Sequence, residues 1–187
     1  MAVLEIARLG HPVLRQIAQP VDPKELTDPG DNELQTLIDD MVDTMRAEKG
    51  VGIAAPQVAR SLQIVIVEYQ KNERYPSQED IPLTVYVNPV ITWSGGEPGS
   101  FWEGCLSLKD LRGLVTRPQE ITVEAYSRQG EKMMVEAKGF LAVVLQHEMD
   151  HLQGKVFLDR MTDLSQLAFV DEWQTYWVEK EPAAPEI

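Results

Sequence analysis

One apolar segment, residues 139–154, constrains the fold of this chain most. It begins and ends at glycines and contains no proline, which predicts a helix of about four turns. Apolar side chains cover nearly the whole circumference of this helix, as is typical of a buried helix. The same helix carries His147, Glu148 and His151, which are costly in a protein interior unless they have partners. A bound metal would supply such a partner.

The spacing of these three residues indicates how a metal would be held. His147 and His151 are four positions apart, so their rings lie one above the other and can reach a single ion. Glu148 points to the side, where it could accept a proton from a water at the metal. The same pattern also fits two core histidines paired with backbone carbonyls, so other parts of the chain must decide.

A catalytic site built on two histidines needs a third protein ligand and an open position. One class of metalloprotease places a third histidine six residues after His151, but Phe157 occupies that position. Asp171 or Glu172 could provide a carboxylate, although both fit the solvated face of an amphipathic helix. Cys105, after a glycine-rich turn, offers a thiolate that suits zinc or iron(II). A lone cysteine can equally be a small buried apolar residue.

Composition argues against several kinds of partner. The 187 residues carry a formal net charge of -13, which does not suit a surface for nucleic-acid phosphates or anionic membranes. The N-terminus lacks the basic start and apolar run of a signal peptide, and no stretch approaches the roughly 20 apolar residues of a membrane span. With a single cysteine, Cys105, no internal disulfide can form. We expect a cytoplasmic protein, and we expect it to be a monomer.

The remaining pattern predicts an α+β fold, with a mainly antiparallel sheet around the central metal-binding helix and helices at the N-terminal and C-terminal ends. The expected elements are an amphipathic helix from residue 31 or 32 to Gly50, strands at 62–67 and 84–93, a hairpin of 120–126 and 131–137, and a C-terminal helix capped by Asp163. Residues 71–83 are expected to form an exposed polar loop. We expect one catalytic domain at 1–165, followed at 166–187 by the C-terminal helix and an acidic, disordered tail.

Three segments resemble the signature motifs of the peptide deformylases, in the same order and with similar separations. They are Gly50-Val51-Gly52-Ile53-Ala54-Ala55-Pro56-Gln57, Glu103-Gly104-Cys105-Leu106-Ser107 and Gln146-His147-Glu148-Met149-Asp150-His151. The resemblance extends over residues 4–160, and three linked motifs are far more specific than any one of them. It implies removal of the formyl group from the N-terminal formylmethionine of new polypeptides, with release of formate.

The resemblance also implies a role for each candidate residue. The metal ligands would be Cys105, His147 and His151, and the ion would usually be iron(II), with zinc, nickel or cobalt as alternatives. Glu148 would be the general base. The Gln57 side chain and the backbone N–H of Leu106 would stabilise the charge that builds on the former carbonyl oxygen.

The substrate pocket follows from the helical wheel and from the resemblance. Phe140, Val143 and Val144 share the sector of the two histidines, so they can line an apolar pocket suited to a methionine side chain. They could instead pack only against the protein. The resemblance places Val51, Gly52 and Gly104 at the walls of the site and at the edge that receives the peptide backbone.

Two other functions could use the same helix. A general metallopeptidase would cut unformylated peptides, and a non-catalytic module would use the metal for stability, with Glu148 or a distant carboxylate as fourth ligand. Some bacterial deformylases dock on the ribosome through a basic C-terminal extension. Residues 163–187 here hold six acidic residues and one lysine, so we expect at most a transient contact with the ribosome.

Overall fold

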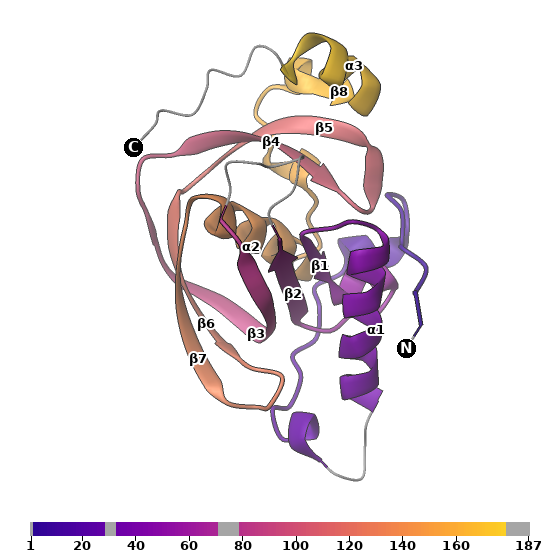
Figure 1. The fold of residues 1–187 in the computed structure, drawn as a ribbon, viewed down its shortest axis with the longest axis vertical. Coiled ribbons are helices and arrows are strands. Elements are labelled where there is room, and N and C mark those ends of the chain that lie inside the picture. The colour runs from indigo at the N-terminus through magenta and orange to yellow at the C-terminus, as the bar shows by residue number, and fades with distance from the viewer. Residues whose placement is uncertain (1, 29–32, 71–78, 179–187) are drawn as a thin grey trace.

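The computed structural model describes residues 2–28, 33–70 and 79–178. Its α-helices are α1 (Glu33–Ala47), α2 (Gly139–Leu152) and α3 (Val170–Tyr176), and its strands are β1 (Gly52–Ala54), β2 (Ile64–Tyr69), β3 (Ile81–Gly95), β4 (Gly99–Cys105), β5 (Leu108–Arg117), β6 (Glu120–Tyr126), β7 (Lys132–Lys138) and β8 (Leu167–Phe169) (Figure 1). Every pairing between these strands is antiparallel, which confirms the predicted α+β class. No helix within the described ranges combines the length and the hydropathy that crossing a bilayer requires.

The larger sheet has the order β1-β2-β3-β6-β7 and is covered on both faces where β2 runs. Val65 and Val67 of β2 point into the cluster shared with α2, whereas Ile64 and Ile66 point into the cluster shared with α1. Because successive side chains alternate between the faces of a sheet, a strand buried on both faces is a continuous apolar run. This explains why β2 was recognisable from sequence.

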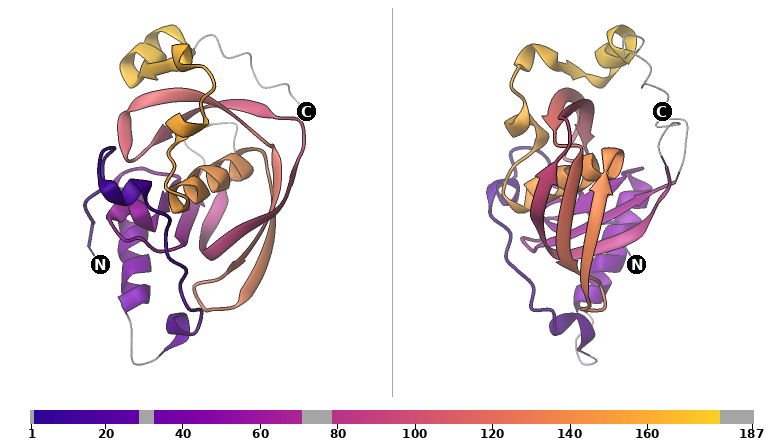
Figure 2. Two further views of the ribbon diagram at one scale, coloured as in Figure 1. Left: turned by 180° about the vertical axis from the view of Figure 1, so that it is seen from behind. Right: turned by 90° about the vertical axis from the view of Figure 1, so that its left-hand side faces the viewer.

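The smaller sheet has the order β4-β5-β8 and lies over the other side of α2, so that α2 is enclosed between the two sheets (Figures 1 and 2). No strand was predicted at residues 99–117, where β4 and β5 lie. Their inward-facing positions include Glu103 and Arg117, both buried. Charged residues at core positions remove the apolar alternation by which a strand is recognised.

The prediction of one C-terminal helix starting at Asp163 was wrong. Asp163 caps only the 3-10 turn Leu164–Gln166, and the next residues form β8, in which Ala168 pairs with Arg112 of β5. The helix α3 begins only at Val170. Pairing with β5 gives the backbone of β8 tertiary hydrogen-bond partners, which outweighs the helical spacing of the apolar residues. The predicted start of α1, most of the predicted loop at 71–83 and the predicted tail lie outside the described residues.

Helix α2 ends in a backbone arrangement that requires a glycine. Gly154 has φ +68°, and its N–H donates to the His151 carbonyl at 3.2 Å while the N–H of Lys155 donates to the Asp150 carbonyl at 2.9 Å. These two bonds form a Schellman motif, which satisfies the last carbonyls of the helix. A Cβ at position 154 would lie 2.8 Å from the carbonyl oxygen of Arg15. The helix end that carries His151 is therefore fixed by its glycine.

Replacing Gly154 by alanine should lower the free energy of unfolding by about 1–3 kcal/mol, since a left-handed alanine is strained and its Cβ meets the Arg15 backbone. Urea unfolding followed by circular dichroism measures this. The matched control is Gln153→Ala at the neighbouring exposed position. This substitution should change the free energy of unfolding by less than about 0.5 kcal/mol. Equal stability of Gly154→Ala and the parent would contradict the expectation.

Candidate metal centre

The three predicted metal ligands meet beneath the end of β4. Cys105 is the last residue of β4, and His147 and His151 project from consecutive turns of α2. Their ligand atoms all lie within 4.8 Å of one another, and Sγ of Cys105 is 3.3 Å from Nε2 of His151. A buried thiolate with two imidazoles is a donor set that fits zinc or iron(II). The alternative carboxylates, Asp171 and Glu172, are exposed on α3 and do not belong to this cluster.

The ring of His147 is oriented by a buried carboxylate. Nδ1 of His147 donates to Oε2 of Glu103 at 2.8 Å, which leaves Nε2 to face the metal centre. Such a partner fixes the tautomer and the direction of a ligating imidazole and increases its basicity. Glu103 comes from β4, two residues before Cys105, so one strand supplies both a ligand and the support for another ligand.

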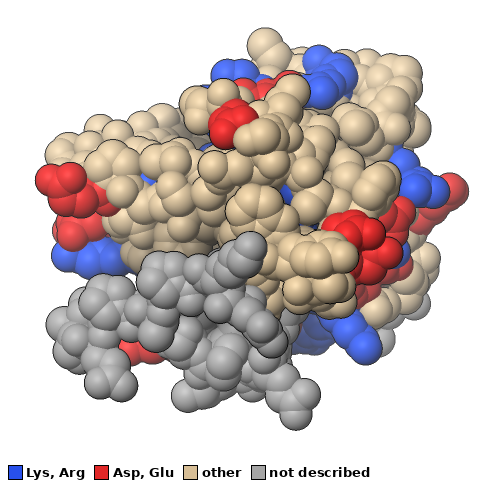
Figure 3. Space-filling view, turned by 90° about the horizontal axis from the view of Figure 1, so that it is seen from above, with Lys and Arg blue, Asp and Glu red and all other residues tan. Residues whose placement is uncertain are grey.

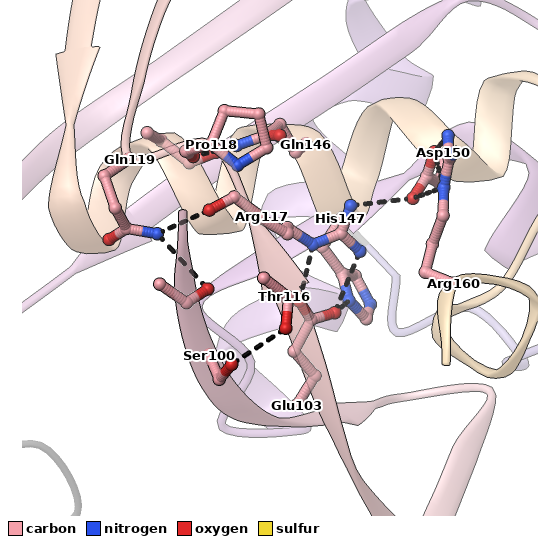
Figure 4. Close-up of polar contacts among 12 residues, drawn as sticks. Ser100, Glu103, Thr116, Arg117, Pro118, Gln119, Gln146, His147, Asp150 and Arg160 are labelled. Carbon is pink, nitrogen blue, oxygen red and sulfur yellow. Dashed lines mark hydrogen bonds and ion pairs between the residues drawn. The ribbon is translucent and has the colours of Figure 1, made fainter. Parts of the chain in front are cut away.

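Glu103 belongs to a chain of ion pairs that leads from the metal centre toward the surface (Figure 4). Arg117 of β5 donates to Glu103 from Nε at 2.5 Å and from Nη2 at 3.0 Å. Its Nη1 donates to Asp150 of α2 at 2.9 Å, and Asp150 also accepts hydrogen bonds from Arg160. Glu103, Arg117 and Asp150 are all buried, so each charge depends on its partners.

Burial and these partners shift several pKa values in opposite directions. Burial alone would raise the pKa of Glu103, but hydrogen bonds from His147 and Arg117 lower it to about 2. Burial alone would lower the pKa of His147, but Cys105 and Glu103 raise it well above its usual value. Burial and the neighbouring charge of His147 lower the pKa of His151 well below its usual value. The neutral imidazole favoured at His151 is the form that binds a metal.

Glu148 lies beside the metal ligands without belonging to their cluster. It packs against β1, where a Cβ on Gly52 would be only 2.6 Å from Oε1 of Glu148. Oε2 is buried and has no hydrogen-bond partner among the described residues. Burial raises the pKa of Glu148 to about 7. The carboxyl group is therefore held in place by close packing, with one oxygen available to a ligand.

The side chain of Gln57 is held in one orientation. It extends from the 3-10 turn Ala55–Val58, where Oε1 accepts the N–H of Ala54 at 2.8 Å. This leaves Nε2 to point toward Sγ of Cys105 at 3.4 Å and Oγ of Ser107 at 3.5 Å. Leu106 follows Cys105 in the turn between β4 and β5, so its backbone N–H is adjacent to the thiol. Two N–H donors thus lie next to the candidate ligands.

The predicted pocket residues occupy different surroundings. Val144 and Phe140 pack into the core cluster of the larger sheet, and the Phe140 ring meets the Tyr69 ring edge-on at 5.5 Å. Val51 packs against the same cluster. Val143, one turn before His147, is buried but is not a member of that cluster. Of the three helix positions, Val143 is therefore the one that lies outside this core cluster.

Both strands that flank the centre are edge strands. The strand β1, which contains Gly52, ends one sheet, and β4, which contains Gly104, ends the other. An edge strand presents backbone N–H and C=O groups that another extended chain can pair with. The site can therefore accept a peptide as an added strand.

Sequence reasoning missed the residues that support the ligands. Glu103 was noted only as part of a motif, Arg117 was not singled out, and Asp150 lies with Gln146 in a narrow polar stripe of the otherwise apolar helix. An available signal was the presence of Asp150 and Gln146 on a helix that is otherwise buried. Gln146 donates to the carbonyls of Pro118 and Ala142, both at 2.9 Å, so this stripe is a set of buried contacts.

Comparisons with known proteins agree with this geometry. The family model described as polypeptide deformylase matches residues 3–167. Peptide deformylase 2 of Pseudomonas syringae pv. tomato is 45% identical over 171 residues, covering 90% of this chain and 93% of that protein. A class I type b peptide deformylase from Acinetobacter baumannii, solved with Met-Ala-Ser bound, superposes with a TM-score of 0.81 at 41% identity, covering 86% of this chain and 99% of that one. A peptide deformylase from Synechococcus elongatus in complex with actinonin superposes with a TM-score of 0.76 at 33% identity, covering 89% of this chain and 82% of that one.

Replacing Glu103 by glutamine should weaken metal binding by about 10–100-fold, because the amide keeps the shape but loses the charge that supports His147. Competition with a chromogenic chelator measures the metal affinity. The control is Glu124→Gln at an exposed position of β6, which should leave the affinity unchanged. Unchanged metal affinity in Glu103→Gln would show that the ion pair serves only the fold.

Proposed function

Because this chain belongs to the polypeptide deformylase family, we propose that it removes the formyl group from the N-terminal formylmethionine of new polypeptides and releases formate. The observation that carries the proposal is the buried cluster of Cys105, His147 and His151 with Glu148 beside it. The Acinetobacter baumannii relative supports it, since that protein binds Met-Ala-Ser, a peptide of the kind that the reaction would leave.

The family is metal-dependent, and we propose iron(II) as the native ion, with zinc, nickel or cobalt also accepted. Cys105, His147 and His151 would hold it. When bound, the ion would act as a Lewis acid that polarises the formyl oxygen and makes a water more acidic. The donor set itself can bind all four metals, so the supply of each metal ion decides which one is bound. A ferrous ion beside a thiolate is sensitive to oxygen, which argues for anaerobic preparation.

Glu148 is proposed as the group that moves the proton. Its free oxygen, Oε2, is buried beside the ligands and can accept the proton of the attacking water. The same carboxyl group can then return a proton to the amine that leaves. The close approach of Gly52 keeps the carboxyl group in position through both transfers.

Gln57 and Leu106 are proposed to stabilise the oxygen that becomes negative during the attack. The Gln57 amide is already oriented by Ala54, so its N–H needs no rearrangement when charge develops. The loss of one such donor typically costs about 3–4 kcal/mol of transition-state stabilisation.

The substrate is proposed to lie as an extended chain between β1 and β4. Val51, Gly52 and Gly104 would receive its backbone, since β1 and β4 are each the last strand of a sheet. The methionine side chain would enter an apolar pocket at the α2 surface formed by Phe140, Val143 and Val144. An unbranched, flexible side chain suits such a pocket.

The alternatives have less support. A closed structural site needs a fourth protein ligand, and within the described residues the cluster contains only three. A general metallopeptidase finds no support in the comparisons, which give deformylases. Because Cys105, His147, His151 and Glu148 come from one chain, we propose that a monomer is active. We propose that it acts in the cytoplasm, where new polypeptides emerge, with at most transient contact with the ribosome.

The Glu148→Ala variant should lose formate release from formyl-Met-Ala-Ser by about 10²–10⁴-fold, because the group that moves the proton is gone. Both proteins are prepared without oxygen and loaded with iron(II) or nickel(II), and formate and bound metal are measured together. The variant should keep its metal, because Glu148 lies outside the ligand cluster. Absence of formate release by the metal-loaded parent would refute the proposed function.

The pocket is tested by Val143→Trp, which should raise KM for the formyl-methionyl peptide by about tenfold because the indole fills the space of the methionine side chain. Metal content should not change. The control is Val90→Trp on the exposed part of β3, where the residue is 57% accessible. If Val143→Trp and Val90→Trp gave the same KM, position 143 would not line the pocket.

A further inference from the structure

The face of β4 that points away from the metal centre is covered by the C-terminal helix α3. Glu103 and Cys105 point inward, whereas Trp102 points outward and meets two tryptophans of the C-terminal segment. The Trp102 ring lies 6.2 Å from the Trp173 ring and 5.1 Å from the Trp177 ring. Figure 3 looks onto this end of the molecule, where most of the surface is uncharged. An aromatic layer thus lies directly behind the strand that carries the thiolate.

Arg112 of β5 connects this layer to the strand. Its guanidinium group lies over the Trp173 ring, 5.7 Å from the centroid. The same group covers Gly104, because a Cβ added there would be 2.1 Å from Nη1 and 2.5 Å from Cζ of Arg112. The guanidinium group, which also donates from Nη1 to the Leu111 carbonyl at 2.8 Å, therefore lies close to both the indole ring and the Gly104 backbone.

Gly104 depends on this support because the β4–β5 ladder is interrupted there. Glu103 pairs with Gly113 and Cys105 pairs with Leu108, so the register shifts at Gly104. Between these two pairs β5 has the four residues 109–112 against the single Gly104 of β4, so Gly104 has no assigned partner in the ladder. A glycine with no side chain and no partner in the ladder has much conformational freedom. The Arg112 guanidinium group limits that freedom from the outer face.

We propose that Trp173 is a positioning residue for peptide binding, which acts by holding Arg112 against Gly104. The inference rests on the proposed function, in which the Gly104 backbone receives the substrate. The polypeptide deformylase model matches residues 3–167, so α3 and Trp173 follow the matched region. A helix beyond the family match thereby sets the affinity for the substrate, while the metal ligands and Glu148 stay as they are.

The first test compares Trp173→Ala, Trp173→Phe and the parent on formyl-Met-Ala-Ser. Trp173→Ala should raise KM by about fivefold, since it removes the ring that holds the guanidinium group, with kcat and metal content within about twofold. Trp173→Phe keeps an aromatic ring at this position, so its KM should be close to that of the parent. Tyr176→Ala is the matched control, because Tyr176 is an exposed aromatic residue of the same helix. Equal KM values for Trp173→Ala and Tyr176→Ala would overturn the proposal.

The second test asks whether Trp173 acts through Arg112. Arg112→Ala should also raise KM, and the double variant should match Arg112→Ala, because a ring with no guanidinium group to hold has no further effect. KM increases that multiply in the double variant would overturn the proposal. A fall in kcat and metal content together, with KM unchanged, would show a purely structural role and would also overturn it. Formate release by the parent establishes the reaction separately from both results.

Discussion

The structure depends on the pairing of charges buried between α2 and the smaller sheet. Glu103, Arg117 and Asp150 are almost inaccessible to water, and Arg117 pairs with both carboxylates while Glu103 also holds His147. Removing one member of a buried ion pair typically costs about 3–5 kcal/mol, because the remaining charge is left without a partner. The network therefore fixes how β4, β5 and α2 lie relative to one another, and the relative position of the metal ligands follows from it.

The site is assembled from parts that are distant in sequence but close in the fold. The strand around Gly52 supplies the packing for Glu148, the end of β4 supplies the thiol, and α2 supplies both imidazoles. The strands β1 and β4, which carry Gly52 and Cys105, are each the last strand of a sheet. Backbone pairing at such an edge would hold a peptide without reading its side chains, which fits the substrate position proposed above.

The sequence predicted the elements whose burial follows a simple period. The helix α2, the strand β2 and the hairpin of β6 and β7 lie close to where they were expected, because their apolar spacing matches their faces. The smaller sheet was missed, because its inward positions carry Glu103 and Arg117 and β8 forms only through a long-range pairing. The candidate ligands were chosen from spacing and resemblance, and the structure brings them together. The supporting ion pairs were missed, because a charged residue in a sequence is normally read as a surface residue.

The ligands also come from separate layers of the protein. Cys105 belongs to the smaller sheet, whereas His147 and His151 belong to the helix α2 between the two sheets. An ion held by all three would act as a cross-link between layers that are otherwise joined by packing and ion pairs. Since an ion that binds only the folded chain stabilises it in proportion to the logarithm of its free concentration, folding becomes coupled to metal supply. A cell short of the metal would lose the protein to unfolding and proteolysis, as well as losing its chemistry.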